Sequence, residues 1–294
     1  MSTGKRLAVD GTDPRCTERH TGLMLIEPEW ARRAIALYAV GQLPVVEARA
    51  DDERLAYTIQ GRVAVIPMFG YMQKGESKFG GVSTVFTRRA LRAATADEEV
   101  DTIVLHIDSP GGSVAGVSEL AGEMVKAKKS KPLLAQIEDL GASAAYWVAS
   151  QADRIYANET AEVGSIGTMA VIVDSSGMAA RDGVKVHVIA TGDKKGIGVP
   201  GREVTEDDLA YLRGRVEAIN GFFQRAVQTG RGLSDKRMEE VSDGRVVIAA
   251  EAKRLGLIDG VQSMETTLAG MMPKPAKGDR RVKAKLRLLD FVRN

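Results

Sequence analysis

The chain has 294 residues, of which 44% are hydrophobic and 27% are charged. This composition is typical of a soluble globular protein, and the length suits one large α/β domain with extensions or two small domains. The formal net charge of +2 is uneven, because residues 273–294 carry +6 and the preceding residues carry −4. Such a basic tail is compatible with an anionic partner surface, although a solvated tail is the commoner case.

Cysteine usage and hydropathy exclude several classes of protein. The single cysteine, Cys16, excludes an intramolecular disulfide and fits a reducing compartment such as the cytoplasm. Three scattered histidines make a zinc site unfavourable, so no metal is expected. No run of about eighteen apolar residues predicts a membrane span, and the first ten residues lack an apolar segment of signal-peptide length.

In chain order, residues 1–22 are predicted to be a disordered lead, and a helix is predicted over residues 28–40. From Arg62 onwards, strands and helices alternate. Strands are predicted over residues 62–67, 101–108, 132–137, 154–157, 170–174 and 184–190. Helices are predicted over residues 83–94, 114–126, 175–181, 206–228, 234–241 and 249–255, and another helix is predicted to begin at Ser143. The long helix over residues 206–228 would start after Thr205 and end before Gly230.

This alternation predicts an α/β fold with a mostly parallel sheet and flanking helices. Residues 1–58 would form an N-terminal extension with one helix. Residues 59–270 would form the α/β domain, and residues 271–294 a basic C-terminal tail that begins with a Pro- and Lys-rich linker at residues 273–278.

The most informative segment surrounds Ser143. Small residues, Gly141, Ala142, Ala144 and Ala145, surround this single hydroxyl where a helix is predicted to begin. A helix N-terminus directs free N–H groups toward negative charge, and a nucleophilic serine is commonly presented in this way. Small-residue runs with a serine also occur in tightly packed core helices, so this segment alone leaves a structural interpretation open.

A second motif, residues 108–113 (DSPGGS), follows a predicted buried strand and precedes a helix. Ligands bind at the carboxyl ends of strands in this type of sheet, and exposed N–H groups of the two glycines could bind an oxyanion. A nucleotide loop is less favoured, because the G-x-G-x-x-G order and the P-loop lysine are both missing. A plain strand–helix turn stays open.

A nucleophilic serine needs a base, and the histidines are poor candidates. His106 and His187 lie in predicted strands, where packing or surface roles are more common, and His20 lies in the predicted lead. A neutral lysine can serve instead. Residues 191–200 contain Lys194 and Lys195 between glycines, and their spacing does not choose between the two.

Together these motifs resemble the signal-peptide-peptidase family of serine proteases, the SppA type, which has a Clp-protease/crotonase-like fold. The resemblance covers roughly residues 62–261. It rests on residues 100–112 (VDTIVLHIDSPGG), 142–147 (ASAAYW), 160–167 (TAEVGSIG), 191–195 (TGDKK), 201–206 (GREVTE) and 243–246 (DGRV) with 252–259 (AKRLGLID).

The resemblance implies a Ser–Lys dyad without a cofactor. Ser143 would be the nucleophile and Lys195 the general base, and Ser165 would hydrogen-bond the lysine amine and position it. Backbone N–H groups of Gly112 and Ala144 would form the oxyanion hole. Cellular members often have Gly-Gly after the nucleophile where this chain has Ala144 and Ala145, a difference small enough to leave activity expected.

Within this family, the single-domain layout is most similar to the head-maturation, or capsid assembly, proteases of tailed bacteriophages. A predicted helix around residues 23–31 resembles the same branch. The resemblance implies scaffold, capsid or portal proteins as substrates, a homo-oligomer without specific nucleic-acid binding, and a location in the host cytoplasm or procapsid. The alternatives are a cellular signal-peptide-peptidase-like protease, and, less favoured, a crotonase-like acyl-CoA enzyme or a non-catalytic assembly scaffold.

Overall fold

A computed structural model of the chain describes residues 23–26, 57–75 and 81–271. The predicted lead over residues 1–22, the predicted helix over residues 28–40 and the basic tail beyond Met271 lie outside the described residues. No helix among the residues described is both long enough and apolar enough to cross a membrane.

The centre of the molecule is an eight-stranded sheet. Its inner strands, β3 (Val63–Phe69), β6 (Thr102–Ser109), β8 (Leu133–Ala142), β9 (Arg154–Ala157) and β10 (Glu162–Gly164), pair in parallel. Three short strands complete it, namely β2 (Thr58–Gln60) beside β3, β12 (Val246–Ile248) beside β10 and β13 (Gly260–Val261) beside β9. Strand β6 buries Ile103, Leu105 and Ile107 on one face and Val104 on the other, so it contributes to the packing on both sides of the sheet. The predicted mostly parallel α/β architecture is confirmed.

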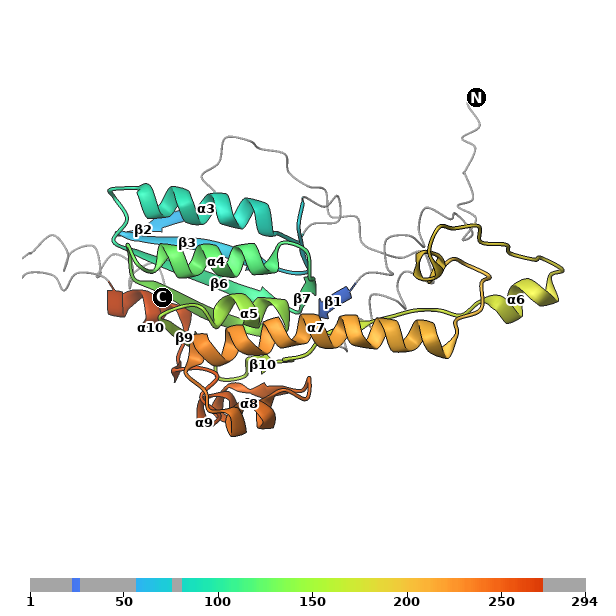
Figure 1. Cartoon of the computed structure of the whole chain (residues 1–294). Coiled ribbons are helices and arrows are strands. Elements are labelled where there is room, and N and C mark those ends of the chain that lie inside the picture. The colour runs from blue at the N-terminus through green and yellow to red at the C-terminus, as the bar shows by residue number, and fades with distance from the viewer. Residues whose placement is uncertain (1–22, 27–56, 76–80, 272–294) are drawn as a thin grey trace, which may run out of the picture.

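Helices cover both faces of this sheet. Helices α3 (Thr84–Ala96), α4 (Val117–Ala127) and α5 (Ala144–Ala149) share one core with the alternate strand residues Ile66, Leu105 and Ile107. On the opposite face, Leu268 of α10 (Met264–Met271) packs on residues of β3, β6 and β8. The long helix α7 (Glu206–Arg231) runs beside α5, and α8 (Asp235–Val241) and α9 (Ala249–Arg254) follow it (Figure 1).

A second, smaller sheet lies at the carboxyl end of β6. Its strand order is β11 (Met169–Ala170), β1 (Leu23–Ile26), β7 (Gly111–Ser113), β4 (Met72–Gln73) and β5 (Val82–Ser83). Leu23–Ile26 therefore form a strand, and the predicted helix around residues 23–31 is wrong for these four residues. Likewise, residues 111–113 form a strand, and the following helix begins only at Val117.

An arm, defined here as residues 171–205, projects from the body together with the first half of α7 (Figure 1). It contains α6 (Ser176–Arg181) and the short 3-10 helix η1 (Asp193–Gly196). The predicted strand over residues 184–190 is wrong, because this segment pairs with no strand of the part described. Its alternating pattern would suit a half-buried strand, yet within the single chain Ile189 is 99% exposed.

The ends of α7 show one prediction confirmed and one corrected. Thr205 caps the helix as predicted, through a capping box with Asp208. The helix ends at Arg231 with Gly232 in the left-handed conformation, so Gly230 lies inside it rather than beyond it. A Cβ on Gly230 would lie 2.2 Å from the Ser150 carbonyl oxygen, so this glycine permits close contact between α7 and the end of α5.

Candidate active site

Ser143 stands at the junction of β8 and α5, as the residue that caps the helix. Its φ of 53° and ψ of −119° are unusual for a residue other than glycine. Two backbone hydrogen bonds hold this conformation, because its N–H donates to the Gly164 carbonyl at 2.8 Å and its own carbonyl accepts from Trp147 N at 2.9 Å. Such strain is found at functional sites more often than elsewhere.

The Ser143 hydroxyl is buried without a partner. The residue is 0% exposed, and its Oγ has no hydrogen bond within the described part of the chain. Leaving a buried hydroxyl unsatisfied costs about 1–3 kcal/mol. A serine that serves only packing would be expected to have a hydrogen-bond partner or to be replaced by alanine. The unpaired hydroxyl therefore suggests a partner that the single chain does not supply.

Helix α5 is fixed firmly behind Ser143. The Trp147 ring stacks on Phe223 of α7 with ring centroids 5.1 Å apart, and Tyr146 Oη donates to the Leu257 carbonyl at 2.7 Å. All six residues of α5 are buried. The small residues around Ser143 therefore pack in the core, as the structural interpretation of this segment expects, and the role of Ser143 as nucleophile stays a prediction.

Ser165 lies beside Ser143 because their strands are parallel and in register. Ala142 of β8 pairs with Gly164 of β10, so the next residue of each strand stands at the same edge of the sheet. Ser165 is the other non-glycine residue with a positive φ, 50°, among those described. Its N–H donates to the Arg245 carbonyl at 2.7 Å. The motif was visible in the sequence, but its strained backbone was not.

Gly112 lies in β7, which contacts α5. A Cβ at Gly112 would lie 2.0 Å from the Met72 carbonyl oxygen, so only glycine fits beside β4. Ser109 fixes the turn before it, since its hydroxyl donates to the Gly70 carbonyl at 2.6 Å and accepts from Gly111 N at 3.2 Å. The backbone of β7 is thus held rigidly next to the start of α5.

The two candidate lysines have different surroundings. Lys194 forms an ion pair with Asp207 and lies 5.9 Å from the centre of the Tyr211 ring. Lys195 lies on η1 and is exposed. Because Ser143 Oγ has no partner, the chain does not bring Lys195 into hydrogen-bond distance of it. The structure thus gathers Ser143, Ser165 and β7, and leaves Lys195 apart on the arm.

The histidines do not join this site. His106 Nε2 lies 2.8 Å from Glu138 Oε2, and its ring packs edge-on against Phe69. Nearby, burial together with the charges of Asp139 and Glu138 raises the pKa of the Asp108 carboxyl. His187 is exposed on the arm, and His20 lies outside the described residues.

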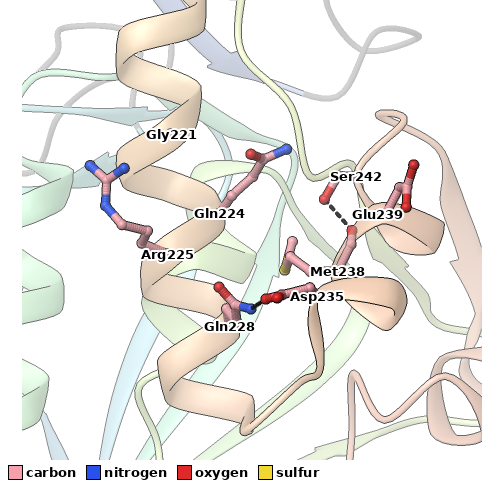
Figure 2. A pocket seen from close by; sticks show the side chains of 8 residues that line it. All are labelled: Gly221, Gln224, Arg225, Gln228, Asp235, Met238, Glu239 and Ser242. Atoms are coloured by element: carbon pink, nitrogen blue, oxygen red, sulfur yellow. Dashed lines mark hydrogen bonds between the residues drawn. The ribbon is translucent and has the colours of Figure 1, made fainter.

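A separate polar hollow lies between the second half of α7 and α8 (Figure 2). Gln228 Nε2 donates to Asp235 Oδ1 at 2.6 Å across it, and Arg225 and Glu239 also line it. None of the predicted site residues lines this hollow. Across residues 57–75 and 81–271, no group of three or more His, Cys, Asp or Glu side chains is arranged to hold a metal ion.

Three relatives illustrate what the chain is similar to. Capsid assembly protease C of Escherichia phage lambda is 30% identical over 234 residues, which cover 76% of this chain and 53% of that protein. A putative protease of Methanocaldococcus jannaschii is 33% identical over 172 residues, 58% of this chain and 55% of that one. A putative signal peptide peptidase SppA of Enterococcus faecium is 28% identical over 179 residues, 60% and 52% respectively.

This chain therefore spans about half the length of these relatives. The family model described as Peptidase family S49 matches residues 125–276, which is more than half of the chain and includes α5, Ser165 and the arm. The match confirms the resemblance to SppA-type proteases and the predicted Clp-protease/crotonase-like fold. The chain belongs to peptidase family S49.

Proposed function

We propose that this chain is a serine endopeptidase in which Ser143 is the nucleophile and Lys195 the general base. The observation that carries the proposal is the Ser143 hydroxyl, buried and unpartnered on a strained backbone at the start of α5. Ser165, in register with it, is suited to hold the incoming lysine amine.

In this mechanism the neutral Lys195 amine removes the Ser143 proton as Oγ bonds to the peptide carbonyl carbon. The N–H groups of Gly112 and Ala144 stabilise the resulting oxyanion, an effect typically worth several kcal/mol. The C–N bond then breaks, and the lysine returns its proton to the leaving amine. A water molecule, deprotonated by the same lysine, hydrolyses the acyl-enzyme and restores the Ser143 hydroxyl.

The lysine would come from a neighbouring copy of the chain. Lys195 is exposed on an arm that also exposes apolar side chains, with Val173 at 73%, Met178 at 60% and Ile189 at 99%. Burying these side chains against a second copy is favourable. The same contact would desolvate the Lys195 amine and so favour its neutral form, which the mechanism requires. The functional unit would be a homo-oligomer.

The substrates we propose are phage head proteins, namely scaffold, capsid or portal protein, cleaved in a procapsid or in the host cytoplasm. The match to capsid assembly protease C, which covers 76% of this chain, favours this role. The second candidate is a cellular protease that degrades residual peptides, favoured by the match to a putative signal peptide peptidase. Incubation with purified head proteins and, separately, with signal peptides would distinguish the two.

Ser143→Ala tests the chemistry directly. Hydrolysis of casein or of a head protein should fall to the background rate, while the melting temperature should not fall, because the lost hydroxyl makes no hydrogen bond. Ser150→Ala is the matched control. Ser150 is also buried, at the other end of α5, but its Oγ donates to the Trp147 carbonyl at 2.7 Å and accepts from Gln151 Nε2 at 2.7 Å. This variant should therefore lose about 1–2 kcal/mol of stability and keep its activity. Near-normal turnover by Ser143→Ala would refute the proposal.

A further inference from the structure

A short segment far upstream of the protease domain completes the smaller sheet. Strand β1 lies between β7 and β11 and is antiparallel to both. Leu25 pairs with Gly112 and Met24 with Ser113 on one side. On the other side, Leu23 pairs with Ala170 and Met24 with Met169. Without β1, a slot one strand wide would separate β7 from β11, and each strand would present an open backbone edge to it.

Both edges of this slot continue directly into the candidate active site. Strand β7 carries Gly112, a predicted oxyanion donor, and contacts α5. Strand β11 begins four residues after Ser165, on the segment that follows β10. The last residue of β10, Gly164, accepts the Ser143 N–H through its carbonyl. A strand held between β7 and β11 therefore lies along the two segments that flank Ser143.

Such a slot is well suited to an extended polypeptide. Proteins that bind peptides of varied sequence often add them as a strand to an open sheet edge, because backbone hydrogen bonds do not depend on the side chains. With two edges, the slot can pair with both sides of a peptide. In the chain as it stands, however, the slot is filled, and Ser143 beside it is 0% exposed.

We propose that β1 is a resident, substrate-like strand, which occupies the peptide-binding slot and which a polypeptide substrate must displace. This inference rests on the proposed protease function and adds regulation to it. Because β1 belongs to the same chain, it competes at a high effective concentration, and its release controls access to the site. The alternative is that β1 is a permanent structural strand, whose loss would lower stability and activity together.

Substitutions in the full chain separate these two roles. Neighbouring N–H groups of a strand point to opposite sides, so Met24→Pro with Leu25→Pro removes one donor toward each neighbouring strand. We expect the apparent KM for a peptide substrate to fall about ten-fold with kcat unchanged, because a competing strand has been released. The matched control is Met24→Leu with Leu25→Met, which exchanges the two side chains and keeps every N–H. It should retain the native KM. An unchanged or higher KM in the proline variant would overturn the inference.

A binding experiment gives a readout that does not depend on catalysis. In the Ser143→Ala chain, a fluorescent peptide with the sequence of residues 20–29 should bind about ten-fold more tightly when Met24→Pro and Leu25→Pro are also present. A peptide carrying the same two prolines should not bind. If this difference is seen while the chains that keep Ser143, with and without the two prolines, do not hydrolyse peptides, the protease proposal fails and the slot assignment stands. Equal binding to both chains would overturn the slot assignment.

The native chain offers a third test, which holds even if the proline variant does not fold. The unlabelled peptide of residues 20–29, added in excess, should raise the apparent KM for a peptide substrate without changing kcat, and the proline-containing peptide should have no effect. Absence of competitive inhibition at millimolar peptide, about the effective concentration of a tethered segment, would contradict the occupancy of the slot by β1.

Discussion

Two neighbouring serines share an unusual backbone conformation. Ser143 and Ser165 are the non-glycine residues with positive φ among those described, and one hydrogen bond, from Ser143 N–H to the Gly164 carbonyl, joins their segments. Holding each residue in this region costs of order 1–3 kcal/mol. Since glycine would adopt the conformation at lower cost, the presence of serine at both positions supports the roles proposed above for the two hydroxyls.

The sequence left the choice between Lys194 and Lys195 as the general base open, and the family resemblance favoured Lys195. The structure adds a physical reason, because Lys194 is engaged by Asp207 and Tyr211 while Lys195 has no described partner among residues 57–75 and 81–271. The Lys194 amine is thus already engaged within its own chain, whereas the Lys195 amine is available to another group.

Lys195→Ala should therefore reduce peptide hydrolysis to the background rate, and Lys194→Ala should retain most of it. The two variants are each other's control, because both remove one cation from the same turn. In the native chain, kcat/KM should also fall toward acidic pH as the base becomes protonated. Activity lost in Lys194→Ala and kept in Lys195→Ala would move the base to Lys194, and a flat profile between about pH 5 and pH 9 would exclude a lysine base.

Among the helices and strands, sequence patterns predicted the elements whose own residues carry the pattern, such as a cap or an apolar run. The cap Ser83, which accepts from Phe86 N at 3.2 Å, and the apolar run of β6 identified α3 and the central strand. Strands β7 and β10 were missed because three residues are too few to show a period, and their pairing depends on distant partners. The motifs of the resembled family indicated Ser143, Ser165 and Gly112. The slot filled by β1 depends on the pairing of three segments that are distant in the sequence, so only the structure shows it.

Gly112 provides a test of how β7 is held. In Gly112→Ala, the new Cβ would approach the Met72 carbonyl to 2.0 Å, so β7 and β4 must separate. We expect a lower melting temperature together with a large loss of activity. Gly122→Ala is the matched control, because that position in α4 has no atom within 4 Å of the added Cβ, and alanine in a helix is favoured over glycine by about 1 kcal/mol. Equal stability of the two variants would contradict the close packing inferred at β7.

Asp259 links α7 to the edge of the central sheet. Burial alone would raise the pKa of its carboxyl, but hydrogen bonds from Arg231 and the Ile155 N–H outweigh burial and lower it. Arg231 Nη1 lies 3.0 Å from Asp259 Oδ2 and its side chain is 8% exposed. A carboxyl with a lowered pKa stabilises the fold above its unfolded pKa of about 3.9, and this contribution is lost as the pH falls through the folded pKa.

Asp259→Asn should therefore lower the melting temperature at pH 7, where it leaves Arg231 without its charged partner. It should also flatten the fall in melting temperature on acidification below about pH 5. Thermal melts of both chains across this range measure the effect. Parallel curves, offset by a constant amount, would show that the ionisation of Asp259 contributes nothing to stability.

In the whole molecule, the proposed catalytic residues lie in two separate parts, the body and the arm. The body holds Ser143, Ser165 and Gly112 in a rigid frame, while Lys195 lies on the arm, away from any core of its own chain. The exposure of Ile189 on the arm supports the contact between copies proposed above, because burying this side chain would be favourable. The same contact would complete each active site, so activity would depend on assembly.

Co-assembly of Ser143→Ala with Lys195→Ala chains tests this dependence. Each variant alone should be inactive. If one copy supplies the serine and its neighbour the lysine, a closed ring mixed at random in equal amounts has both groups intact at about a quarter of its sites, and activity should recover to about that fraction. Sedimentation must show mixed oligomers, and each variant mixed with itself serves as the control. Failure to recover activity in verified mixed oligomers, or full activity of a monomer, would place both residues of the dyad in one chain.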